Sequence, residues 1–183
     1  MNDARSTQGS VAESFLRALK QRGLDIVFAN SGTDFAPLIE ALVRLKEAGE
    51  ETPDFMTIPH ENLAMAMAHG YHRVSGKPVA VMVHVTPGTA NAVCGLMNAQ
   101  RDHVPLVLIA GRTPITQAGS IASRSAPIHW GQENFDQAGM VREYTKWDYE
   151  LRNAETTGVV INRAIQVATT EPAGPVYLVV PRE

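Results

Sequence analysis

The sequence VAVMVHVTPGTANAVCGLMNAQRDHVPLVLIAG at residues 79–111 contains two long aliphatic runs separated by a segment of helical composition. The runs at 79–85 and 105–111 have the length of strands, a Pro-Gly pair marks a turn, and residues 89–102 are expected to form a helix. Strands that do not alternate apolar and polar residues are typical of parallel sheets buried on both faces. This segment therefore predicts a parallel sheet covered by helices.

The same alternation of helices and strands extends over the rest of the chain. A long loop is expected at 112–132, where Gly, Ser, Ala and Pro are frequent and no period is visible. Further helices are expected at residues 11–22, 38–49, 61–75, 133–138 and 154–170, and further extended segments at 25–30, 55–58, 143–148 and 175–181. The sequence predicts an α/β fold, with a parallel sheet of about six strands and helices on both faces.

Length and composition describe one globular domain. The chain has 183 residues, which fits a single domain of roughly 100 to 200 residues. Its hydrophobic fraction of 44% and charged fraction of 19% exclude intrinsic disorder as the general state. We expect residues 1–10 to form a flexible tail and residues 11–183 to form the domain.

Charge and cysteine content exclude several classes of partner. The net charge of −3 and the lack of any basic run argue against nucleic acid. Every apolar run is far shorter than the roughly 20 residues of a membrane helix, and the first ten residues lack the apolar centre of a secretory signal. Cys94 is the single cysteine, so no intrachain disulfide forms, and we expect it to be a small core residue. A cytoplasmic location is expected.

Polar residues follow each of the first four predicted strands. These residues are Thr33, Glu61, His84 and Arg112. The carboxyl ends of parallel strands meet at one edge of a sheet, and ligands bind there. We therefore expect these side chains to gather at one edge, although position alone does not define the chemistry.

Two of these residues have both a structural and a functional interpretation. Glu61 at the start of a helix would be stabilised by the helix dipole, yet the apolar residues that follow it could desolvate the carboxyl and favour its protonated form. His84 interrupts an aliphatic strand, so it is either a core histidine bonded to the backbone or an acid-base group. Arg112 is interpreted as an ion pair at an interface, with a clamp for a substrate carboxylate as the alternative.

Known ligand motifs are few. Residues 87–91, PGTAN, enter a helix and offer free N–H groups to an anion. Neither a dinucleotide motif nor a P-loop occurs, and the HExxH zinc motif fails because Ala64 stands where the second histidine belongs. No metal site is predicted.

Several segments in order resemble the N-terminal pyrimidine-binding domain of thiamine-diphosphate-dependent enzymes of the acetolactate synthase, benzoylformate decarboxylase and pyruvate decarboxylase group. The segments are ANSGT at 29–33, PHEN at 59–62 and HVTPGTANAVCGLMNAQRDHVPLVLIAGRTP at 84–114. The resemblance covers residues 11–183, nearly the whole chain. It implies thiamine diphosphate as cofactor and a 2-oxo acid as substrate.

The resemblance also implies roles for individual residues. Glu61 matches the glutamate that bonds N1′ of the cofactor's aminopyrimidine, where a shared proton favours the tautomer that activates the thiazolium carbon. His84 matches an active-site histidine of the benzoylformate decarboxylase branch, which implies proton transfer. Thr33, Pro87, Gly88 and Asn91 complete the expected cofactor-binding set.

One family motif is missing. The GDG motif that binds diphosphate and Mg²⁺ is absent, because the chain contains no Asp-Gly pair. The resemblance therefore implies a diphosphate-binding domain on the same or another chain, a homodimer or tetramer, and no catalysis by this domain alone. The alternatives are a separate subunit of a split decarboxylase, as in sulfopyruvate decarboxylases, and a non-catalytic dimerisation or regulatory module.

Overall fold

The computed structural model describes residues 9–183. Its centre is a six-stranded sheet in the order β2-β1-β3-β4-β6-β5, in which every neighbouring pair is parallel. The predicted α/β class and the parallel sheet are confirmed. The strands are β1 Ile26–Ala29, β2 Asp54–Thr57, β3 Val79–Val83, β4 Leu106–Arg112, β5 Asp148–Glu150 and β6 Val176–Pro181.

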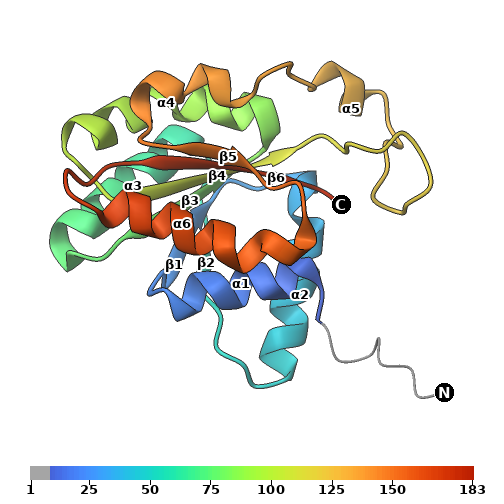
Figure 1. Cartoon of the computed structure of the whole chain (residues 1–183), viewed down its shortest axis with the longest axis horizontal. Coiled ribbons are helices and arrows are strands. Elements are labelled where there is room, and N and C mark those ends of the chain that lie inside the picture. Colours follow the sequence, from blue (N-terminus) through green and yellow to red (C-terminus); the bar gives the residue numbers. More distant parts are fainter. Residues whose placement is uncertain (1–8) are drawn as a thin grey trace.

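Helices cover both faces of the sheet, as Figure 1 shows. Helices α1, α2 and α6 pack on one face, whereas α3 and α4 pack on the other. The short helix α5 lies outside these layers, in the segment between β4 and β5. The helices are α1 Val11–Gln21, α2 Ala36–Glu47, α3 Glu61–Ser75, α4 Val85–Arg101, α5 Ile128–Gly131 and α6 Thr157–Thr169.

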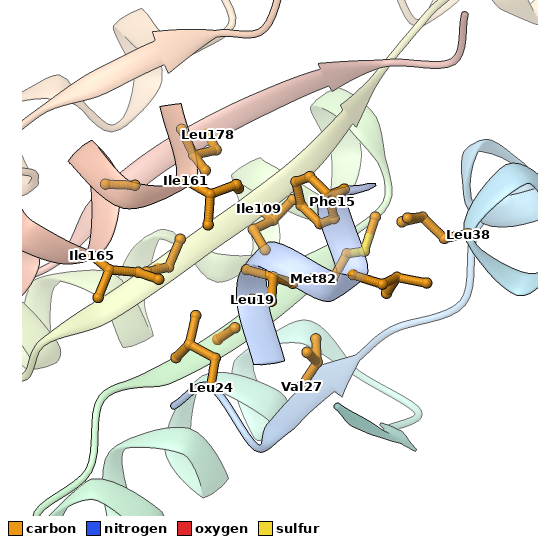
Figure 2. Packing of buried hydrophobic residues seen from close by; sticks show 14 of the residues in the cluster. Phe15, Leu19, Leu24, Val27, Leu38, Met82, Ile109, Ile161, Ile165 and Leu178 are labelled. Carbon is orange, nitrogen blue, oxygen red and sulfur yellow. The ribbon is translucent and has the colours of Figure 1, made fainter. Parts of the chain in front are cut away.

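The two faces of the sheet enclose two apolar cores. On the α1 side, Phe15 and Leu19 pack with Ile109 of the sheet and Ile161 of α6 (Figure 2). On the α3 side, Met65 and Leu96 belong to the second core. The inner strands β3 and β4 are buried on both sides, which explains their continuous aliphatic sequence.

The chain reverses direction across the sheet between β1 and β3. From β1 it moves outward through α2 to the edge strand β2, and then returns through α3 on the other face to β3, on the opposite side of β1. This arrangement creates a topological switch point between the carboxyl ends of β1 and β3. Such points are where open parallel sheets bind their ligands.

Several predicted boundaries were wrong. Helix α4 starts at Val85, directly after His84, so the Pro-Gly pair lies in its first turn and not in a turn before it. Proline is compatible with this position because the first N–H groups of a helix have no intrahelical acceptor. Cys94 is exposed and not a core residue, because it lies on the face of α4 opposite its buried side chains.

The segment between β4 and α6 departs most from the prediction. In place of a helix at 133–138, it forms α5 and the 3₁₀ turn Ala138–Met140, and the 3₁₀ turn Arg142–Tyr144 precedes β5 where an extended segment was expected. Side-chain contacts decide this path. Gln137, for example, donates to the Gly111 carbonyl at 2.9 Å.

Only residues 9 and 10 of the predicted tail fall within the described part of the chain. Residues 1–8 of the predicted tail lie outside the described residues. Ser10 does not belong to a tail, since its hydroxyl accepts a hydrogen bond from the Glu13 N–H and caps α1. Among residues 9–183, no helix is long and apolar enough to span a membrane.

Candidate functional site

The edge formed by the carboxyl ends of the strands holds all four residues that the sequence placed there. Thr33 begins the 3₁₀ turn Thr33–Phe35 after β1, and Glu61 begins α3 after β2. His84 lies between β3 and α4, and Arg112 ends β4. His84 and the turn after β1 flank the switch point.

The imidazole of His84 is held at both nitrogens. Its Nδ1 lies 2.5 Å from Oδ1 of Asp34, and its Nε2 lies 3.3 Å from the side-chain nitrogen of Gln132. The Asp34 side chain is only 5% exposed, whereas that of His84 is 23% exposed. The ring is therefore fixed from the protein side and remains accessible from the other.

The backbone around Asp34 is shaped to admit its carboxylate. A Cβ atom on Gly111 would collide with the Asp34 carboxylate, and one on Gly32 would collide with both Asp34 and His84. The second carboxylate oxygen faces the Val85 N–H at 3.4 Å. Val85 itself has φ of +33°, which is strained for a β-branched residue and is typical of functional sites.

The surroundings of His84 favour its charged form. The hydrogen bond with Asp34 raises the pKa of His84, and the negative charges of Asp34 and Glu61 act in the same direction. Partial burial lowers the pKa, but the carboxylate prevails. His84 thus keeps its second proton to a higher pH than a free histidine.

Glu61 has a different environment. The residue is 8% exposed, and its Oε2 accepts one hydrogen bond, from the Asn91 amide at 3.1 Å. Its Oε1 accepts no hydrogen bond from residues 9–183 and lies beside Gly88, where a Cβ would come within 3.4 Å. Glu61 is therefore a buried carboxyl with one oxygen free for a ligand.

Comparison with known proteins shows the family of this chain. Residues 9–140 match the family described as "Thiamine pyrophosphate enzyme, N-terminal TPP binding domain". The chain belongs to this family. Among its relatives is the mitochondrial acetolactate synthase catalytic subunit of Aspergillus candidus, 33% identical over 93% of this chain and 23% of that protein. Benzoylformate decarboxylase of Pseudomonas aeruginosa is 31% identical over 89% of this chain and 28% of that protein.

Solved structures support the same family. The thiamine diphosphate-dependent 4-hydroxybenzoylformate decarboxylase of Rhodococcus jostii superposes with a TM-score of 0.78 at 30% identity, over 95% of this chain and 30% of that one. A thiamin diphosphate-dependent enzyme from Mycobacterium smegmatis gives a TM-score of 0.77 at 30% identity, over 96% of this chain and 31% of that one. The chain spans about a quarter of the length of the two curated relatives named above.

Within this family domain, the expected cofactor-binding residues are not all placed together. Asn91 and Gly88 lie against Glu61. Thr33 is exposed and lines a small recess beside His84, while Pro87 is exposed in the first turn of α4. Glu61, Gly88 and Asn91 thus form one group, and Thr33 belongs with His84.

Arg112 forms ion pairs within the chain. It lies 2.6 Å from Glu150 and 3.8 Å from Glu133, so the ion pair expected at an interface is an intramolecular one. No group of three His, Cys, Asp or Glu side chains in residues 9–183 has the geometry of a metal site.

Two residues of the site were missed in the sequence. Asp34 directly follows Thr33 in a turn at the predicted edge, so its position was a signal that was not used. Gln132 is similar to residues at this position in related proteins, but it lies in an irregular segment and no site role was predicted for it. Its backbone oxygen accepts a hydrogen bond from the Thr86 hydroxyl at 2.9 Å, which ties that segment to the start of α4.

Proposed function

We propose that this chain is the pyrimidine-binding domain of a thiamine-diphosphate-dependent enzyme that cleaves or forms a carbon-carbon bond at a 2-oxo acid. The observation that carries the proposal is the buried Glu61 carboxyl, with one oxygen free, at the same sheet edge as His84. Family membership supports the cofactor, and the named decarboxylases and acetolactate synthases support the substrate class.

The residues around Glu61 fit an aminopyrimidine ring. Oε1 would bond N1′ of the ring and share a proton with it, while Asn91 keeps the other carboxylate oxygen in place. Gly88 lies beside Oε1, where an added Cβ would touch this oxygen at 3.4 Å and crowd Val83 at 3.0 Å. When bound, the cofactor supplies a nucleophilic thiazolium carbon and an electron sink.

His84 would move a proton to or from the reacting substrate. Its Nε2 is the nitrogen that Asp34 does not hold, its side chain is partly exposed, and its raised pKa suits a proton donor near neutral pH. Thr33 lines the same recess and would contact the substrate with its hydroxyl. Glu61 and His84 therefore have separate tasks, one toward the cofactor and one toward the substrate.

The active enzyme would need a partner domain. The diphosphate group and Mg²⁺ would be bound by a domain on the same or another chain, and the active form would be a homodimer or tetramer. A separate subunit of a split 2-oxo acid decarboxylase and a non-catalytic dimerisation or regulatory module are the alternatives. In the module, Glu61 and His84 would have no ligand to act on.

Calorimetry distinguishes a thiamine-diphosphate-dependent enzyme from the non-catalytic module. Thiamine diphosphate and Mg²⁺ are titrated into the complete assembly, meaning this chain together with its diphosphate-binding domain. The proposal predicts saturable heat that weakens in Glu61→Ala and is unchanged in Glu143→Gln, an exposed control. Absence of cofactor-dependent heat in the assembly would support the non-catalytic module.

A further inference from the structure

We propose that Asp34 is the positioning residue of His84: it holds the proton on Nδ1 and leaves Nε2 as the nitrogen that exchanges a proton with the substrate. The role of Nε2 rests on the proposed function, whereas the state of the ring does not. Asp34 contacts the reaction only through His84.

The geometry of the Asp34–His84 pair differs from an ordinary surface contact. The described chain contains a second such pair, in which Nε2 of His69 lies 2.9 Å from Asp102, whose side chain is 55% exposed. Asp34 is 5% exposed and lies 2.5 Å from His84, with its other oxygen facing the Val85 N–H. Buried carboxylates that hold histidine rings in this way fix the tautomer as well as the orientation.

The tautomer follows from which groups can donate. An ionised carboxylate only accepts hydrogen bonds, so Nδ1 of His84 must carry the proton that faces Asp34. In the neutral ring, Nε2 is then an acceptor, and the Gln132 amide can donate to it across 3.3 Å. In the charged ring, a rotated Gln132 amide would present its oxygen to the Nε2 proton.

The other charged groups near His84 do not take the role of Asp34. Arg112, His129 and Arg182 line the recess, and these groups would oppose a positive ring. Arg112, however, is paired with Glu150 at 2.6 Å, and Glu61 adds negative charge from the start of α3. Asp34 is the charged group that touches the ring itself.

The proton transfer balances without a further reactant. The charged ring gives the proton of Nε2 to the substrate and becomes neutral, while Nδ1 keeps its proton and Asp34 stays ionised. Nε2 then recovers a proton from solvent or, in the reverse direction, from the substrate. Asp34 thus stabilises the imidazolium without becoming protonated.

Nitrogen NMR of the imidazoles tests the state of the ring in the chain itself. The wild-type spectrum should show His84 as the Nδ1–H tautomer when neutral. Asp34→Asn keeps an acceptor oxygen but loses the charge, so the pKa of His84 should fall. Asp102→Asn, which changes the other histidine-aspartate pair, should leave the titration of His84 unchanged.

Each outcome is decisive. An Nε2–H tautomer in the wild type overturns the proposal without any variant, and so does an unchanged titration in Asp34→Asn. If Asp34→Asn does not fold, the wild-type tautomer still decides.

The pH profile of the complete assembly separates this inference from the proposed function. If His84 donates the proton, the alkaline limb of kcat should move to lower pH in Asp34→Asn. A limb that stays in place while the NMR titration moves would leave the positioning intact and refute the catalytic role of His84.

Discussion

Glu61 and His84 lie at the starts of neighbouring helices, yet their side chains differ in hydrogen bonding. Within residues 9–183, Glu61 accepts one hydrogen bond, from Asn91, and its other carboxylate oxygen lies free beside Gly88. His84 is bonded at both ring nitrogens, on one side by a buried carboxylate. Under the proposed function, the residue that would share a proton with the cofactor retains an open hydrogen-bonding position, whereas the residue that would transfer a proton to the substrate is fixed in orientation.

On the His84 side of this comparison, removal of the imidazole should have the largest effect. In the complete assembly, His84→Ala should lower kcat by about 100-fold, a typical contribution of general acid-base catalysis, with a smaller loss of cofactor affinity. Steady-state kinetics together with a cofactor titration measure both quantities. Kinetics equal to the wild type across pH would show that His84 only packs.

Filling the space that Gly111 leaves for the Asp34 carboxylate should have the next largest effect. Gly111→Ala would force a Cβ into the Asp34 carboxylate and should lower the free energy of unfolding by about 1–3 kcal/mol. The matched control is Gly158→Ala in α6, which has open space and should raise stability by about 0.5–1 kcal/mol. Denaturant titration measures both; equal stability of Gly111→Ala and wild type would contradict the tight fit.

Loss of the Asn91–Glu61 hydrogen bond should weaken cofactor binding more than loss of the longer Gln132–His84 contact. Asn91→Ala removes the amide donor of Glu61 and should weaken thiamine diphosphate binding to the assembly by about 0.5–1.5 kcal/mol, or roughly 2- to 12-fold. Gln132→Ala leaves His84 bonded to Asp34 and should change cofactor affinity less. A larger loss of cofactor affinity in Gln132→Ala than in Asn91→Ala, measured by calorimetry, would contradict this prediction.

The pH dependence of stability should give the smallest effect. The pKa of His84 is raised in the folded state, so its pairing with Asp34 contributes stability that is complete below about pH 6.5, the ordinary value for histidine, and declines as pH rises through the folded-state value. Asp34→Asn should therefore lower the free energy of unfolding most between about pH 5 and 6.5, by about 1 kcal/mol. Unfolding curves at several pH values test this; a cost that grows with pH would contradict it.

The sequence was most informative where regular elements decide the structure. Continuous aliphatic runs predicted β3 and β4 and hence a parallel sheet, and the residue after each strand then had to lie at one edge. Glu61 could be found because it begins a helix. These features depend on local patterns that a single sequence displays.

Contacts between distant residues could not be predicted in the same way. Asp34 and His84 are 50 positions apart, and Gln132 and His84 are 48 apart. The path of the segment after β4 depends on side chains such as Gln137, which also donates to the buried Tyr177 hydroxyl at 2.9 Å. No periodicity records such contacts, so the short helix expected at 133–138 was wrong and Gln132 was missed.

Hydrogen-deuterium exchange at the thiazolium carbon of bound thiamine diphosphate tests the role of Glu61 most directly. In the complete assembly, the wild-type chain should exchange rapidly, and Glu61→Gln should slow the exchange by about 100- to 10,000-fold, because the amide cannot share its proton with N1′. Glu143→Gln should exchange like the wild type. An exchange rate in Glu61→Gln equal to that of the wild type would contradict the account.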